Sequence, residues 1–384
     1  MMADSTNLMP ATARQLQLIP LGCLAHNCNL VLKDLILTDP RLTSLCGISS
    51  LIVASIHRSS AASANIKKRL TSYVVTRLYS FLECISSIDA AKDEIRHFAT
   101  QLEKDQLLTA IDDFCASAEK VTAVVRIMTP FKDAFTRLSA EKQPTGDQVI
   151  LILLSIRKQL ERLRDASATL QSEGNLLAGR ALELFNARFQ TEFARKEWLL
   201  CAALNPIARQ LLSRLNLMDG MRSHLKSEMR RYRPLVEEEE RKNAINLSDR
   251  IPLKKRIVTP SFADDIETVF FDESQTSETD QAEDRIEREI ESFFAVNPTF
   301  KFNEFQILEF WKVNSSAWPI LSRVARAFLC IPATSLACER SFSMAGNMNS
   351  SKRNRMLPGT INQRMRIKFN KKILESLGIT WWRK

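Results

Sequence analysis

The chain has 384 residues, of which 45% are hydrophobic and 26% are charged, and its formal net charge is +10. This balance is that of an ordinary globular protein, and the length is too great for one small core, so we expect two or three domains. Glycine is scarce, with 9 residues, and tyrosine occurs 3 times. Because helices avoid glycine and sheets favour aromatic residues, the composition predicts a mostly helical protein.

The sequence argues against a membrane protein and against a disulfide-rich secreted protein. The chain has no run of about 18 apolar residues, and its first residues lack the basic start and apolar centre of a signal peptide, so we expect no membrane segment. The 8 cysteines are scattered along the chain. Such spacing predicts reduced thiols in an intracellular compartment and not a disulfide framework.

The predicted elements begin with a short apolar run at residues 18–21, which resembles the end of a buried strand although Pro20 weakens that assignment. Residues 24–36 have helical periodicity, and Pro40 ends that helix. From about residue 45 to 235 one helix follows another, including a clear helix at 149–163, with breaks expected at Pro130, Pro144 and Pro206.

Residues 241–290 are polar and charged, which predicts an acidic, partly disordered linker. Within it, Lys254-Lys255-Arg256 is either a nuclear-import signal or an ordinary basic patch. Structure is expected to resume at Ile290. Pro319 is placed to start a helix, Pro332 to end it, and Thr334 or Ser335 to cap the next one.

The positive charge is concentrated at the end of the chain. Residues 347–384 contain ten basic residues and one acid, Glu375, so the rest of the chain carries a net charge of only +1. The polyanion expected to bind such a segment is DNA. The residues chosen as DNA contacts are Lys352, Arg353, Arg355, Arg364 and Arg366. A solvated basic helix surface is the alternative.

One long stretch carries a family resemblance. It contains Trp311-Lys312, Trp318-Pro319-Ile320-Leu321, Ala325-Arg326-Ala327-Phe328-Leu329 and the run Ile331-Pro332-Ala333-Thr334-Ser335-Leu336-Ala337-Cys338-Glu339-Arg340-Ser341-Phe342, and Arg353, Arg355, Leu357, Pro358 and Asn370 follow at matching spacing. This stretch resembles the C-terminal dimerisation region of hAT-superfamily transposases. The resemblance implies a homodimer, and the side chains expected at its interface are Trp311, Trp318, Ile320, Leu321, Phe328 and Phe342. The alternative is that the aromatic and aliphatic residues among them pack within the chain, between the insertion and the RNase H-like segment.

Three shorter elements upstream resemble the same superfamily in the same order. They are the segment from Cys23 and His26 to Leu30, the segment Val75-Thr76-Arg77-Leu78-Tyr79-Ser80, and Leu204-Asn205-Pro206. Two of them depart from the family pattern: Leu78 stands where the family has a tryptophan, and Asn205 where it has an aspartate. Leu78 lacks the π face on which a DNA base could stack, so we expect it in the core of its helix.

The resemblance implies an RNase H-like catalytic fold, interrupted by a large helical insertion, with three carboxylates that hold two divalent metals. Glu339 matches the family's glutamate and Asp4 is the candidate second carboxylate. No residue of this chain matches the first aspartate. We therefore expect no cofactor, with Mg²⁺ required only if a full-length catalytic site exists.

Glu339 has an unusual context for a carboxylate. On a helix that starts at Ser335, it would lie within about 60° of both Leu336 and Phe342, which makes the charge costly unless it is paired or binds metal. The alternative is an ion pair with Arg323 or Arg340. Zinc bound by Cys23, His26 and Cys28 is a further reading, but four ligands are usual and the other histidines have no cysteine at the required spacing.

The predicted fold class is therefore mainly α with a small α/β part, an incomplete RNase H-like fold interrupted by an all-helical insertion. The predicted divisions are a partial RNase H-like segment at 1–40, the insertion at 41–240, the linker at 241–290 and the dimerisation region with the final RNase H-like helix at 291–384. Residues 18–37 and the helix after Pro332 are expected to meet.

Three functions fit the sequence. The favoured one is a dimerising, DNA-associated nuclear protein of transposase descent without catalysis. The second is an active hAT transposase, of which this is a truncated record, with Mg²⁺-dependent DNA cleavage and transfer. The third is a protein-interaction scaffold that uses only the dimer surface.

Overall fold

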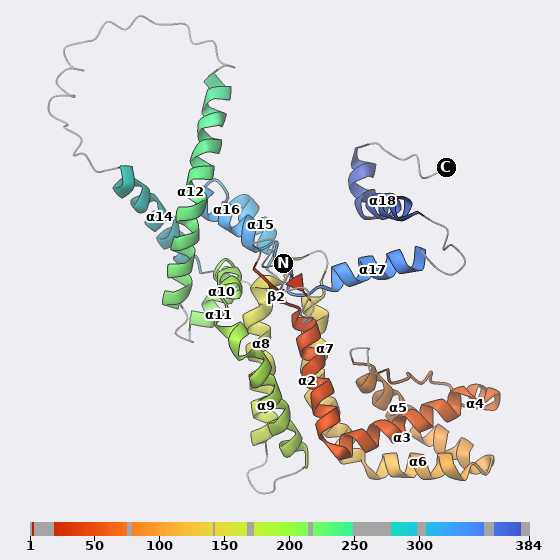
Figure 1. Cartoon of the computed structure of the whole chain (residues 1–384). Helices are drawn as coiled ribbons and strands as arrows, with labels where there is room; N and C mark the ends of the chain where they lie inside the picture. Colours follow the sequence, from red (N-terminus) through yellow and green to blue (C-terminus); the bar gives the residue numbers. More distant parts are fainter. Residues whose placement is uncertain are drawn as a thin grey trace, which may run out of the picture. The chain divides into compact units, whose positions relative to one another are not determined.

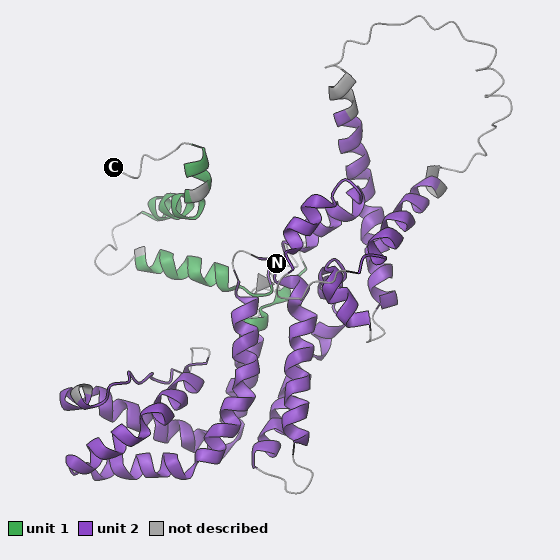
Figure 2. Cartoon of the chain, turned by 180° about the vertical axis from the view of Figure 1, so that it is seen from behind, with its two compact units in different colours: residues 1–26, 333–384 green, residues 27–332 purple. Residues whose placement is uncertain are grey.

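The computed structural model describes residues 2–3, 19–74, 79–140, 143–166, 173–213, 218–248, 278–297, 305–348 and 357–377. The chain divides into two compact units (Figure 2). Unit 1 combines residues 1–26 with residues 333–384, and unit 2 is formed by residues 27–332. The ends of the chain thus belong to one unit although more than three hundred residues separate them.

Unit 1 contains a pair of short parallel strands. Strand β1 (Met2–Ala3) lies beside β2 (Leu21–Gly22), with Met2 opposite Leu21 and Ala3 opposite Gly22. The predicted strand at 18–21 overlaps the observed β2 only at Leu21. The strand begins after Pro20, whose ring nitrogen has no hydrogen to donate to a neighbouring strand. The unit also contains helices α17 (Leu336–Met348) and α18 (Pro358–Ser376), which contact each other.

The regular secondary structure described in unit 2 is all helical (Figure 1). Helix α2 (Leu24–Thr38) enters it from unit 1, and the first helices that follow are α3 (Pro40–His57), α4 (Ser60–Asn65), α5 (Ser80–Gln101), α6 (Asp105–Ala116) and α7 (Ala118–Leu138). The short turn η1 (Gly146–Gln148) then leads into α8 (Val149–Asp165), α9 (Glu173–Phe193), α10 (Lys196–Ala203) and α11 (Pro206–Leu212). The last four are α12 (Met218–Ser248), α14 (Glu278–Phe294), α15 (Ile307–Val313) and α16 (Pro319–Phe328). The mainly α prediction is confirmed, whereas the RNase H-like fold stays a prediction.

Several helices of unit 2 begin in the same way. Pro40, Pro206 and Pro319 each occupy the first turn of their helix, where a missing N–H has no cost, so the predicted start at Pro319 is confirmed. The prediction that Pro130 interrupts a helix is wrong, because Pro130 lies buried inside α7. The apolar side of α7, which includes Phe131, is packed into the core and holds the helix together across the proline.

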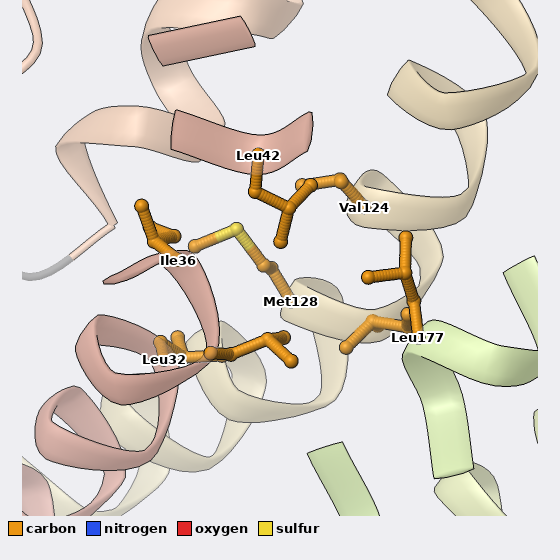
Figure 3. Close-up of a pocket in the computed structure, with 8 residues that line it drawn as sticks. Leu32, Ile36, Leu42, Val124, Met128 and Leu177 are labelled. Atoms are coloured by element: carbon orange, nitrogen blue, oxygen red, sulfur yellow. The ribbon is translucent and has the colours of Figure 1, made fainter. Parts of the chain in front are cut away.

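A small void lies in the core of unit 2, bounded by α2, α3, α7 and α9 (Figure 3). Its volume is about 10 Å³. The side chains that line it are all apolar: Leu32, Leu35, Ile36, Leu42, Val124, Ile127, Met128 and Leu177. A void of this size holds at most one water molecule, and its lining offers that water no hydrogen bond. It is a packing defect and not a ligand site.

Helices α12 and α14 both extend into the segment 241–290 that the sequence predicts as a linker, and residues 249–277 of it lie outside the described residues. Ion pairs link the two helices: Arg230 pairs with Glu283 at 2.7 Å and Lys226 with Glu287 at 2.6 Å. On the adjacent side α14 buries Ile286, Ile290 and Phe293 completely. The charges that indicated a linker therefore belong to the outer face of an amphipathic helix.

None of the described helices is by itself long and apolar enough to cross a membrane. Only α2 and α3 taken together, which meet at 97°, satisfy the requirement of length and composition.

Candidate functional site

The two distant parts of unit 1 meet where β2 ends. The amide of Leu24 donates to the carbonyl oxygen of Ala333 over 3.2 Å, and the amide of Ser335 donates to Sγ of Cys23 over 3.3 Å. Cys23 is buried, and His26 follows in the first turn of α2, half-buried. The predicted meeting of residues 18–37 with the helix after Pro332 is confirmed by these two hydrogen bonds.

Glu339 lies in the first turns of α17, and its surroundings differ from the prediction. The side chain is exposed, and its Oε1 accepts a hydrogen bond from the Ser335 hydroxyl at 2.8 Å. Phe342, expected to surround the carboxylate with apolar surface, is itself 74% exposed. The prediction that apolar side chains shield the Glu339 carboxylate from water is therefore wrong, because Glu339 and Phe342 are both exposed to solvent. Asp4 lies outside the described residues.

A metal site needs several ligand side chains close together. Among them, no three His, Cys, Asp or Glu side chains are grouped closely enough to hold an ion. Cys23 and Cys28 are both buried, and Sγ of Cys23 already accepts a hydrogen bond. The described side chains thus do not form the two-metal arrangement that the resemblance implies, and Asp4, one of its expected carboxylates, lies outside them.

Most of the residues predicted to form a dimer interface lie inside unit 2. Ile320 and Leu321 are fully buried, and Trp311 and Trp318 are 7% and 5% exposed. The indole N–H of Trp311 donates to the carbonyl oxygen of Leu204 at 3.0 Å, and that of Trp318 to Oγ of Ser292 at 3.1 Å. These four side chains are core residues and not a docking surface. These aromatic and aliphatic side chains do cover an apolar surface, but that surface belongs to the same chain.

An aromatic cluster explains why they are buried. The ring of Phe293, at the end of α14, lies 5.2 Å from the ring of Trp311 and 5.4 Å from that of Trp318. Phe310 completes the cluster, 5.5 Å from Trp311. Phe328 lies at the end of α16 and is half-buried. Aromatic packing of this kind joins α14, α15 and α16 into one body within unit 2.

The start of α16 is capped by a carboxylate from another helix. Glu289 of α14 is buried, and it accepts hydrogen bonds from the amides of Leu321 at 2.9 Å and Ile320 at 3.4 Å. Burial raises the pKa of Glu289, and the two amides act in the opposite direction. A negative charge at a helix N-terminus satisfies N–H groups that the helix itself leaves unpaired. Trp318, at the N-cap position, provides no such bond.

Arg209 is a cation that binds carbonyl oxygens at the C-terminal end of α14. The sequence pattern did not indicate this residue. Its Nη2 donates to the carbonyl oxygens of Phe293 and Val296, at 3.0 Å each. The guanidinium also lies 4.3 Å from the ring centre of Phe293. Burial lowers the pKa of Arg209 to about 10, so the group stays charged at neutral pH. Its position three residues after Pro206 offered no signal of a partner some 85 residues away.

The Leu204-Asn205-Pro206 element forms a buried polar joint. Oδ1 of Asn205 caps α11 by accepting from the amides of Ile207 at 3.0 Å and Ala208 at 3.2 Å, while its Nδ2 donates to Oδ2 of Asp147 at 2.7 Å. Both side chains are at most 3% exposed. Burial raises the pKa of Asp147 to about 6. The asparagine thus supplies the donor that this carboxylate needs.

The element around Leu78 is described only in part, because residues 75–78 lie outside the described residues. Tyr79 is buried and donates its hydroxyl to the carbonyl oxygen of Phe131 at 2.7 Å. The Oγ of Ser80 accepts from the amide of Val74 at 3.0 Å. Both described side chains of this element therefore hold α5 in place, and the expectation for Leu78 stays a prediction.

The predicted DNA contacts divide into two groups. Lys352, Arg353 and Arg355 lie outside the described residues. Arg364 and Arg366 are exposed on α18. They are two residues apart on a helix, about 200° around its axis, so they project from nearly opposite sides. Arg364 instead shares its side with Lys368 and Lys371, which are also exposed.

Unit 1 exposes several large apolar side chains. Besides Phe342 on α17, they are Leu357, Phe369, Ile373 and Leu377, which are between 50% and 73% exposed along α18 and its ends. Single exposed apolar residues are common on proteins, but a series along one helix and its neighbour is typical of a surface that another protein covers.

Comparison with known proteins bears on this same region. Residues 289–370 match the model of the hAT family C-terminal dimerisation region, and no curated protein matches the chain. The match starts at Glu289, the carboxylate that caps α16, and ends at Asn370 in α18. It confirms the predicted resemblance and extends it toward the N-terminus, across the aromatic cluster. Residues 289–370 are thus similar to the dimerisation region of hAT-family transposases.

Proposed function

We propose that this protein self-associates through α17 and α18 and associates with DNA in the nucleus, without cutting it. The observation that carries the proposal is the division of the matched region into two parts. Its first part, up to α16, buries its aromatic and aliphatic residues within unit 2, whereas its second part leaves Phe342, Phe369 and Ile373 exposed. A second copy of the chain is the partner that a dimerisation region implies.

Self-association is tested by light scattering. We expect a mass of roughly twice 43.7 kDa at micromolar concentration. The double variant Phe342→Gln/Ile373→Gln should weaken the dimer at least tenfold, because each change removes an apolar side chain from the surface that the partner covers. The matched control is Leu308→Gln, which alters a leucine of the matched region that is 54% exposed on unit 2. A monomeric parent chain, or a control as harmful as the double variant, contradicts the proposal.

DNA strand cleavage is the second candidate, and the junction at Cys23 favours it. The hydrogen bonds from Leu24 to Ala333 and from Ser335 to Cys23 bring α17 to the end of β2, as the resemblance implies for the helix that carries the catalytic glutamate. Cleavage would need carboxylates in addition to Glu339. Its test is Mg²⁺-dependent nicking of duplex DNA, which Glu339→Gln should abolish and Glu309→Gln, an exposed carboxylate on α15, should leave unchanged. Nicking that persists in Glu339→Gln removes Glu339 from this role.

A further inference from the structure

Helix α18 has one side lined by cations. Arg364, Lys368 and Lys371 are spaced by four and three residues, so on a helix they lie within about 60° of one another. All three are exposed, and in the described part of the chain no ion pair involves them. We call these three residues the basic stripe. Exposed cations without an ion-pair partner among the described residues are available to an external anion.

A second side of α18 is apolar. Ile361, Met365, Phe369 and Ile373 follow at intervals of four residues, and we call them the apolar ridge. Ile361 and Met365 are half-buried, and Phe369 and Ile373 are 50% and 59% exposed. The middle of the ridge lies roughly 110° around the helix from the middle of the basic stripe. A partner that covers the ridge therefore leaves the stripe in contact with solvent.

The basic stripe is about as long as three phosphate steps along one DNA strand. Arg364 and Lys371 are seven residues apart, which is about 10.5 Å along a helix. Three phosphate steps on one strand of a duplex cover roughly 10 Å along its axis. The stripe thus spans about four phosphates of one strand, and each of its three cations can contact a phosphate within that span. Contacts to phosphates carry no sequence information, so the stripe should bind duplex DNA of any sequence.

We propose that the basic stripe binds the phosphates of one strand of duplex DNA while the apolar ridge of the same helix binds a second copy of the chain. This inference rests on the proposed function and deepens it, because it assigns the two activities to different sides of one helix. Substitutions can therefore remove DNA binding without self-association, or self-association without DNA binding. Arg366, on the far side of the ridge, is not part of the stripe.

An anionic membrane surface is the other polyanion that a basic helix can bind. The distribution of apolar residues on α18 argues against it. Ile367 lies about 180° around the helix from the middle of the ridge, and it is half-buried, as is Leu374 beside it. Apolar groups on opposite sides do not form the single wide face that lies in a membrane surface.

The test uses the full chain and a short random duplex, with the affinity measured by fluorescence anisotropy over a range of salt concentrations. In the stripe variant, Arg364→Gln/Lys368→Gln/Lys371→Gln, loss of three phosphate contacts should reduce the slope of log affinity against log salt by about 2.7 per chain. At about 0.1 M salt the affinity should fall on the order of a hundredfold. Its mass by light scattering should remain that of the parent chain.

Two further variants make the outcome decisive. The charge-matched control is Lys158→Gln/Arg162→Gln/Arg326→Gln, three exposed cations of unit 2, and it should keep the parent slope. The ridge variant Phe369→Gln/Ile373→Gln should lose the dimer but keep the slope per chain. An equal loss of slope in stripe variant and control overturns the inference, as does stronger binding of the parent chain to phosphatidylserine vesicles than to duplex. A parent chain that binds no duplex removes the proposed function itself, whereas binding with an unchanged slope in the stripe variant removes this inference alone.

Discussion

Replacing Asn205 with aspartate is expected to lower the free energy of unfolding at pH 7.5 by about 3 kcal/mol, the scale of an unpaired charge in a core. The variant keeps the two hydrogen bonds that cap α11, because a carboxylate oxygen can still accept from Ile207 and Ala208. It loses the Nδ2 donor that now lies 2.7 Å from Oδ2 of Asp147. Two buried carboxylates at that distance must share a proton.

The sign of the pH dependence follows from the direction of the shift. The pKa of Asp147 is already raised from 3.8 to about 6 in the parent, so the folded state holds this proton more tightly than the unfolded state. Stability attributable to this group is therefore complete below about pH 4 and is lost as the pH rises toward 6. In Asn205→Asp a second carboxylate raises the folded pKa further, and the loss becomes larger and extends to higher pH.

Urea unfolding followed by circular dichroism at pH 5 and pH 7.5 measures the effect. The matched control is the exchange Asp147→Asn/Asn205→Asp, which restores one amide and one carboxylate and should recover most of the lost stability. Equal destabilisation at both pH values, or an exchange no better than the single variant, would show that the two side chains do not interact in this way.

Replacing Arg209 with methionine is expected to cost about 3 kcal/mol of stability, because it leaves buried carbonyl groups at the end of α14 without a donor. The carbonyl oxygens of Phe293 and Val296 each lie 3.0 Å from Nη2, and that of Phe294 lies at 3.5 Å. Methionine retains part of the contact with the Phe293 ring, so the loss reports mainly on the charged hydrogen bonds. The pKa of Arg209, about 10, lies well above neutrality, so the cost should be constant from pH 6 to 8.

Hydrogen exchange at α14 is the local measurement and urea unfolding the global one. Arg326→Met, an exposed arginine on α16, is the control and should change stability by less than about 0.5 kcal/mol. Arg209→Lys should fall between the two, because an ammonium group keeps the charge but lacks the planar fork that meets several carbonyls. If Arg209→Met behaves like Arg326→Met, the guanidinium does not hold the end of α14.

Local chemistry was enough to predict many of the helices. The apolar periodicity at residues 149–163 predicted α8, and Pro319 marked the start of α16, because both signals act within one or two turns of the chain. Composition was misleading between residues 278 and 290, where charge indicated a linker. The acidic side chains of α14 are paired with α12, and only the period of Ile286, Ile290 and Phe293 could have revealed the helix.

The sequence alone determined that the chain is mainly helical, that it resembles the hAT dimerisation region and that its end is basic, because each of these depends on residue identity and spacing. Only the tertiary structure decided which apolar residues face the chain's own core. Trp311 and Trp318 pack on Phe293 while Phe342 and Ile373 are exposed, although all four belong to the same apolar pattern. Tertiary contacts also determined partners of Asn205, Arg209 and Glu289, since each of these buried polar groups bonds to an atom at least 31 residues away. Spacing along a helix reports which side of it is apolar, and it carries no information on what covers that side.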